Sequence, residues 1–170
     1  EGVILQLTLG DKGSYLYAAW GAPVAHEDDV QRAAHAALEL LVPPPAFSYI
    51  GSVQIGLSRG EMRTGAYGSA TRRTYGALGD EVNLAARLMS ASPPGEVYAT
   101  PGVLDRARPV FGSRALEPFS VKGKAEPVQA YAVGDEIGVR DTRHEEGSFI
   151  GRRPELAREG GRDPSRHTLP

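Results

Sequence analysis

Cysteine is absent from all 170 residues of the chain. Its absence excludes disulfides, thiolate metal sites and a cysteine nucleophile, and it fits a cytoplasmic protein. The chain also has no large excess of one charge, since it contains 19 lysines and arginines and 21 aspartates and glutamates. We therefore expect no nucleic-acid partner. No apolar run approaches the roughly 20 residues that a membrane helix needs, so we expect no membrane partner either.

The overall composition, with 41% hydrophobic and 24% charged residues, is typical of a soluble globular domain. The length suffices for one domain with a hydrophobic core. Apolar runs at residues 3–9 and 14–20 flank a glycine-containing turn, which predicts a β-hairpin. Asp11 lies at the tip of this hairpin, where aspartate is also a common turn residue.

The rest of the chain alternates between helix and strand patterns. An acidic turn at residues 27–29 followed by an apolar stripe predicts a helix that ends before the prolines at 43–45. Alternating apolar residues predict a strand at 53–57, a turn, and a returning strand at 62–67, followed by a polar loop at 69–74. Further elements are predicted as strands at 96–99, 111–116 and 128–133 and as a short helix at 101–107.

Residues 75–88 form the most informative stretch, reading Tyr-Gly-Ala-Leu-Gly-Asp-Glu-Val-Asn-Leu-Ala-Ala-Arg-Leu. The pattern predicts a strand end, a glycine turn and a helix with Asp80 as its N-cap. Asn83 and Arg87 are four residues apart and share one helix face, where together they can reach one anion or can simply be solvated. The predicted apolar face of this helix consists of Val82, Ala85, Ala86 and Met89.

The string Tyr-x-x-x-Gly-Asp-x-Val-Asn-x-Ala-x-Arg resembles the signature of class III nucleotidyl cyclases, the adenylyl and guanylyl cyclase catalytic domains. The resemblance implies an α+β, ferredoxin-like fold, a mostly antiparallel sheet with helices on one face. It implies that Asn83 and Arg87 are catalytic, stabilising the transition state at the ribose and the α-phosphate. Gly10-Asp11 resembles the hairpin of the family that binds metal, so Asp11 is the expected ligand of two divalent cations, Mg²⁺ or Mn²⁺.

Four further positions are implied in substrate binding. Lys122 and Lys124 match a Lys-Gly-Lys segment of which one lysine binds the triphosphate, although such a loop is often only solvated. Lys12 follows Asp11 as in the second cyclase domain of soluble adenylyl cyclase. Gly76 occupies the position, seven residues before Asn83, that usually holds Asp or Thr in adenylyl cyclases, so the base preference stays open.

The family also implies segments that this sequence does not contain. We expect the chain to lack the first strand, its Phe-x-Asp metal ligand and the helices behind it, and therefore to be N-terminally incomplete. Residues 1–134 are predicted to be the cyclase homology domain and 135–147 a charged linker. Residues 148–170 resemble the start of an ATPase module, through Phe-Ile-Gly-Arg-Arg-Pro-Glu-Leu, or form a disordered tail.

The resemblance thus predicts a lyase of cyclic-nucleotide signalling. It would convert a nucleoside triphosphate, ATP rather than GTP, to the 3′,5′-cyclic nucleotide and pyrophosphate at the interface of a homodimer or with a partner cyclase domain. The alternative is a catalytically weak, cyclase-like regulatory or dimerisation module attached to an ATPase. Gly76 favours this alternative, as does Leu7, which stands where adenine-selective cyclases usually carry a lysine.

Overall fold

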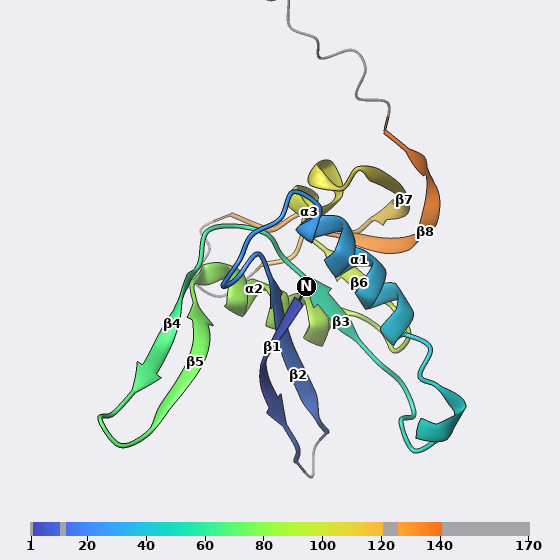
Figure 1. Ribbon diagram of the computed structural model, residues 1–170. Coiled ribbons are helices and arrows are strands. Elements are labelled where there is room, and N and C mark those ends of the chain that lie inside the picture. Colours follow the sequence, from blue (N-terminus) through green and yellow to red (C-terminus); the bar gives the residue numbers. More distant parts are fainter. Residues whose placement is uncertain (1, 11–12, 121–125, 141–170) are drawn as a thin grey trace, which may run out of the picture. The chain divides into compact units, whose positions relative to one another are not determined.

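The computed structural model describes residues 2–10, 13–120 and 126–140, all within the first of the two units of the chain, Glu1–Arg140. Strands β1 (Gly2–Thr8) and β2 (Tyr15–Trp20) form an antiparallel hairpin in which Leu7 pairs with Leu16 (Figure 1). This confirms the predicted hairpin. Among the described residues, no helix is long and apolar enough to cross a membrane.

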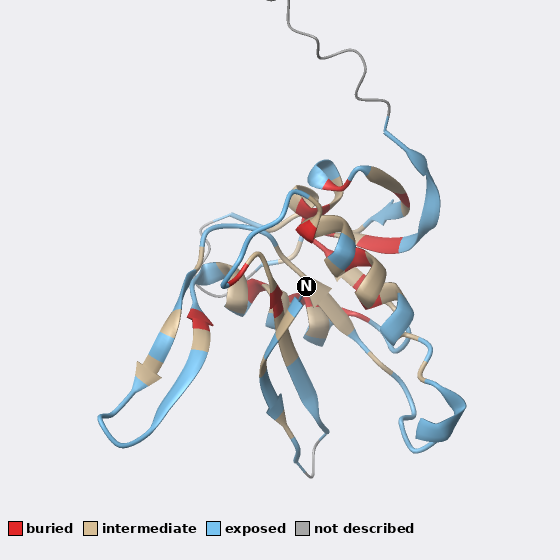
Figure 2. Cartoon of the chain, in the orientation of Figure 1, coloured by how far each residue is buried: buried red, intermediate tan, exposed pale blue. Residues whose placement is uncertain are grey.

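A four-stranded sheet forms the centre of the fold. It contains β3 (Ile55–Leu57), β6 (Val97–Ala99), β8 (Tyr131–Val139) and β7 (Pro109–Ala115), in that order. Strands β3 and β6 are parallel, whereas β6–β8 and β8–β7 are antiparallel. Buried residues concentrate on these strands and on the helices packed against them (Figure 2).

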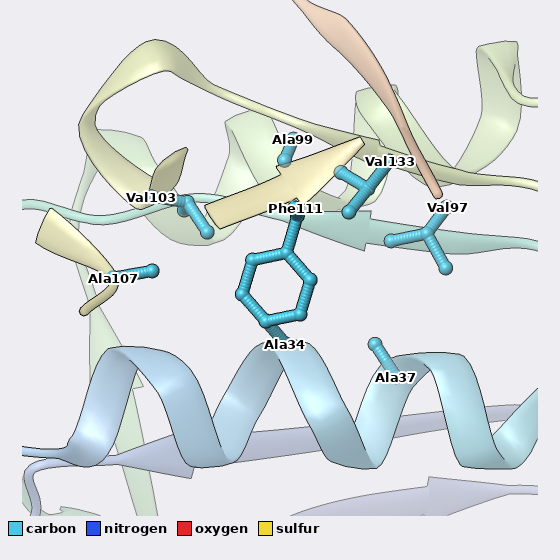
Figure 3. Close-up of a cluster of buried hydrophobic side chains, with 8 residues drawn as sticks. All are labelled: Ala34, Ala37, Val97, Ala99, Val103, Ala107, Phe111 and Val133. Atoms are coloured by element: carbon cyan, nitrogen blue, oxygen red, sulfur yellow. The ribbon is translucent and has the colours of Figure 1, made fainter. Parts of the chain in front are cut away.

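Helices α1 (Asp29–Leu40) and α3 (Pro101–Arg106) cover one face of this sheet. The ring of Phe111 points from β7 toward Ala34 of α1, while Val97 and Val133 fill the space beside it (Figure 3). This cluster contains eight buried residues: Ala34, Ala37, Val97, Ala99, Val103, Ala107, Phe111 and Val133.

Helix α2 (Asp80–Ala91) packs on the opposite face, with Leu84 and Leu88 buried against Ala130. The two faces follow from strand alternation in β3, because Ile55 and Leu57 join the α1 cluster while Gly56 faces α2. The helices therefore lie on both faces of this sheet, and the prediction that they lie on one face is wrong.

A second hairpin leads into α2. Strand β4 (Arg63–Gly68) pairs antiparallel with β5 (Arg73–Leu78) and forms a separate two-stranded sheet (Figure 1). The prediction that residues 62–67 return as a strand beside residues 53–57 is wrong, because β3 pairs with β6 and not with β4. The predicted polar loop is shorter than expected because its last residues, Arg73 and Thr74, already belong to β5.

Strand β8 also differs from its predicted bounds. It begins at Tyr131 and continues to Val139, past the predicted end at residue 133, because Pro109 and Val110 of β7 pair with Val139 and Gly138. Val128 lies outside the strand and forms an isolated bridge with Phe119. A short 3₁₀ turn, η1 (Pro45–Phe47), follows α1 at the prolines that were expected to end that helix.

Candidate functional site

The start of α2 is fixed by glycine rather than by a capping side chain. Gly79 is the N-cap residue, and Asp80 is the first helical residue and makes no side-chain capping bond, so the predicted cap at Asp80 is wrong. A Cβ at Gly79 would lie 3.2 Å from the carbonyl oxygen of Glu61 and 3.3 Å from Cγ of Met62. A side chain at this position would therefore be tightly packed against Glu61 and Met62. Asp80 and Glu81, in the first turn, complement the positive end of the helix.

The rotation of α2 about its axis decides which of its residues are buried and which lie at the surface. Leu84 and Leu88 are buried, Asn83 is exposed and Arg87 is half-buried. The predicted apolar face is therefore wrong: Ala86 is exposed, and Val82, Ala85 and Met89 are only half-buried. Asn83 and Arg87 stand one turn apart on the same helix face, as the spacing predicted.

Gly56 explains this rotation. A Cβ on Gly56 would collide with the carbonyl oxygen of Ala85 and the amide nitrogen of Met89, and would lie 2.9 Å from Cβ of Leu88. The absent side chain lets the backbone of α2 lie directly on β3. The two leucines are then turned into the core, and the Asn83–Arg87 face is turned away from it.

The position predicted to read the base, Gly76, lies in β5 directly opposite Gly65 of β4. A Cβ on Gly76 would meet Cδ2 of Tyr67 at 3.7 Å, which is ordinary van der Waals contact. The Tyr67 hydroxyl donates a hydrogen bond of 2.7 Å to the carbonyl oxygen of Arg63. Sequence reasoning missed Tyr67, because only the pairing of β4 with β5 brings it beside Gly76.

The first hairpin holds the predicted metal ligand. Asp11 and Lys12 lie outside the described residues, but the flanking glycines are described, and the amide of Gly13 donates to the carbonyl oxygen of Gly10 at 3.1 Å. Gly13 has a φ of 118°, a conformation that glycine adopts without strain. Among the described residues no group of three or more potential metal ligands occurs.

Contacts connect β2 to the entrance of α2. The hydroxyl of Tyr17 in β2 donates to the sulfur of Met62 at 3.8 Å, and Met62 lies against Gly79. Burial raises the pKa of the Tyr17 phenol above its ordinary value.

The two predicted triphosphate lysines, Lys122 and Lys124, also lie outside the described residues. The backbone bridge between Phe119 and Val128 holds together the two segments that flank them, with reciprocal hydrogen bonds of 3.2 and 3.0 Å. Beside Val128 lies an open depression of about 580 Å³, lined by apolar residues such as Leu84 and by polar residues that include Arg59 and Glu81, the latter from the first turn of α2.

Nucleotidyl cyclases are among the solved structures that are similar to this fold. The guanylate cyclase domain of RhGC from Catenaria anguillulae, solved in complex with GTP, superposes with a TM-score of 0.65 at 25% identity, over 80% of this chain and 74% of that one. The adenylyl cyclase CyaB from P. aeruginosa gives a TM-score of 0.63 at 28% identity, over 80% of this chain and 73% of that one.

Sequence comparison agrees with the fold. An uncharacterized protein of Mycobacterium tuberculosis is 32% identical over 111 residues, which cover 65% of this chain and 27% of that protein. The chain thus spans about a quarter of the length of the curated relatives that it matches. The family model described as "Adenylate and Guanylate cyclase catalytic domain" matches residues 8–134. The α+β fold predicted from the signature is confirmed, and the chain belongs to the adenylate and guanylate cyclase catalytic domain family, the class III nucleotidyl cyclases.

Proposed function

We propose that this cyclase domain converts ATP, in preference to GTP, to the 3′,5′-cyclic nucleotide and pyrophosphate at an interface between two cyclase domains. The observation that carries the proposal is the placement of Asn83 and Arg87, one turn apart on a helix whose adjacent side is anchored in the core by Leu84 and Leu88. An anchored helix holds a donor pair in a fixed geometry, which is what transition-state stabilisation needs.

In the proposed reaction the ribose 3′ hydroxyl gives up its proton to solvent and its oxygen forms a bond to the α-phosphorus. The bond from that phosphorus to the bridging oxygen breaks, and pyrophosphate is released. The guanidinium of Arg87 neutralises charge that develops on the α-phosphate, because its planar donors match phosphate oxygens. The amide of Asn83 orients the ribose. Lys12, Lys122 and Lys124 are proposed to bind the substrate, and Gly76 to border the base.

Asp11 is proposed to hold the divalent ions. A carboxylate between Gly10 and Gly13, which close a tight turn, is a hard oxygen donor suited to Mg²⁺ or Mn²⁺, ions that bind through one or two carboxylates and substrate phosphates. When bound, two such ions supply activation of the attacking oxygen and charge neutralisation at the triphosphate.

The site is proposed to form between two copies of this domain or with a partner cyclase domain. A closed two-fold dimer would place the Asp11 hairpin of one copy opposite α2 of the other, and would do so twice. The proposal also includes the domain division predicted from the sequence: a cyclase homology domain at residues 1–134, a charged linker at 135–147, and the start of an ATPase module or a disordered tail at 148–170.

A regulatory or dimerisation module attached to an ATPase is the second candidate function. Two observations favour it: Leu7 is 60% exposed and paired with Leu16, and Gly76 offers no side chain to hydrogen-bond a base. Neither position supplies the polar contact that a base-reading site would use.

The test is cyclic nucleotide formation by the full-length gene product, with Mg²⁺ or Mn²⁺ and either ATP or GTP, measured by liquid chromatography. The Asn83→Ala/Arg87→Ala double variant is the control. Product that disappears in the control supports a cyclase and identifies its preferred base. Absence of product with both nucleotides and both metals favours the regulatory module.

A further inference from the structure

On one face of the β4–β5 hairpin, two residues that pair with each other have no side chain. In an antiparallel pair, residues directly opposite each other and those two positions along lie on the same face. Gly65 faces Gly76, and the next pair on that face is Tyr67 with Thr74. A Cβ on Gly65 would meet nothing within 4 Å, and one on Gly76 would meet only the ring of Tyr67. One face of the hairpin thus has an empty position bordered by an aromatic ring.

Tyr67 is held in place on this face. Its hydroxyl donates to the carbonyl oxygen of Arg63, four residues earlier in the same strand, at 2.7 Å. Its side chain is half-buried although the hairpin is a separate two-stranded sheet. A ring tethered at its far end loses little further freedom when a ligand packs on it, which favours binding.

We propose that the Tyr67 ring positions the purine of the nucleotide and takes over the part that a hydrogen-bonding side chain at position 76 would otherwise have. This inference rests on the proposed function, in which Gly76 borders the base. The strand that carries Gly76 ends at Leu78, and α2, with Asn83 and Arg87, begins two residues later at Asp80. The ring and the ribose–phosphate donors are therefore attached to one continuous strand–turn–helix unit.

Stacking on an aromatic ring predicts a distinct pattern of specificity. Every base has a π-face, so a ring accepts adenine and guanine alike, whereas strong discrimination needs buried hydrogen-bonding groups. We expect kcat/KM for ATP and GTP to differ by less than about tenfold, with ATP ahead. UTP, which has a smaller ring system, should be the poorest of the three substrates.

The experiment compares KM and kcat for ATP, GTP and UTP in the full-length protein and its variants. Tyr67→Ala should raise KM for both purine nucleotides by about tenfold or more with kcat nearly unchanged, since one base–aromatic stack has that magnitude. Tyr67→Phe keeps the ring and should stay within about twofold of the wild type. Thr64→Ala, on the opposite face of β4, is the control for damage to the hairpin.

The Gly76→Asp variant provides a second test, of the preference for ATP over GTP. A Cβ at this position makes only an ordinary van der Waals contact, at 3.7 Å from Cδ2 of Tyr67. A carboxylate there accepts a hydrogen bond from the amino group of adenine but repels the carbonyl oxygen of guanine. We therefore expect this variant to increase the ATP-to-GTP ratio of kcat/KM well beyond that of the wild type.

The outcomes separate this inference from the proposed function. An active wild type in which Tyr67→Ala changes neither KM by more than twofold would overturn the role of Tyr67 alone. A wild type without product overturns the proposed reaction, and binding of fluorescent N-methylanthraniloyl ATP and GTP then tests Tyr67 directly. Weaker binding of both probes to Tyr67→Ala supports the inference, while equal binding, or no binding to the wild type, overturns it.

Discussion

At the scale of single residues, Arg87 is the group whose loss should affect turnover most. Arg87→Ala should lower kcat by about 10²–10³, because the removed donor acts on charge that develops in the transition state. Arg87→Lys keeps the charge but loses the planar fork, so it should recover only part of the rate. Steady-state kinetics of cyclic nucleotide formation measure both effects.

A matched control comes from α3, where Arg106 is an exposed cation in the last helical turn. Arg106→Ala removes the same charge far from the proposed chemistry in sequence and should leave kcat within about twofold, as surface substitutions usually do. Turnover of Arg87→Ala within a few-fold of the wild type would contradict the role assigned to Arg87.

Asp28 provides a residue-scale prediction on pH. A hydrogen bond from the Arg32 side chain, 2.7 Å from Nε to Oδ2, lowers the pKa of the Asp28 carboxyl, and the charge of Arg32 adds to the effect. A lowered pKa in the folded state means that the pair stabilises the fold above the ordinary carboxyl range. That contribution is lost as the pH falls through the lowered pKa.

Arg32→Gln should therefore raise the pKa of Asp28 toward its ordinary value, as seen in a carbon-13 NMR titration of the side-chain carboxyl. The Arg106→Gln variant should leave that titration unchanged. An unaltered Asp28 titration in Arg32→Gln would show that this pair does not hold the carboxylate. The effect should also shrink in high salt, because the pair is at the surface.

At the scale of elements, the packing of α2 on β3 depends on a missing side chain. Gly56→Ala would drive a Cβ into the backbone of α2 at Ala85 and Met89, which cannot move without shifting the whole helix. We expect a loss of about 3 kcal/mol in the free energy of unfolding, at the upper end of overpacking effects. Denaturant unfolding measures the loss.

Gly138→Ala is the matched strand control, since a Cβ there would meet nothing within 4 Å and the residue is exposed in β8. It should change the free energy of unfolding by less than about 0.5 kcal/mol. Gly56→Ala should also reduce cyclase activity, because the displaced helix carries Asn83 and Arg87. Equal stability of the two variants would show that α2 does not lie on β3 as described.

Elements that depend on local sequence were predicted well, and those that depend on distant partners were not. The first hairpin and the helix after Gly79 follow from neighbouring turn residues and periodicity. The pairing of β4 with β5, the extension of β8 and the buried face of α2 follow from strands and glycines elsewhere in the chain. The same division holds at the site, where a contiguous string marks Asn83, Arg87 and Gly76 while Tyr67 needs strand register.

At the scale of the whole molecule, the homodimeric form of the proposed site needs two copies of the domain, each contributing a different half. Asp11→Ala removes the metal half and Arg87→Ala the phosphate half, so each variant alone should be nearly inactive. Mixed subunits should regain activity, because one of the two sites in a heterodimer then combines Arg87 from one copy with Asp11 from the other. Random pairing predicts about one quarter of the wild-type rate.

A mixture of Asn83→Ala with Arg87→Ala is the matched control. Both substitutions damage the same half, so neither site of their heterodimer is complete and no activity should return. Light scattering would establish that subunits pair at the assay concentration. If Asp11→Ala and Arg87→Ala form mixed dimers and still yield no product, the two residues do not act across an interface. The complementing half must then come from the same chain or from a different cyclase domain, and titration of candidate partner domains into the Arg87→Ala protein would distinguish these arrangements.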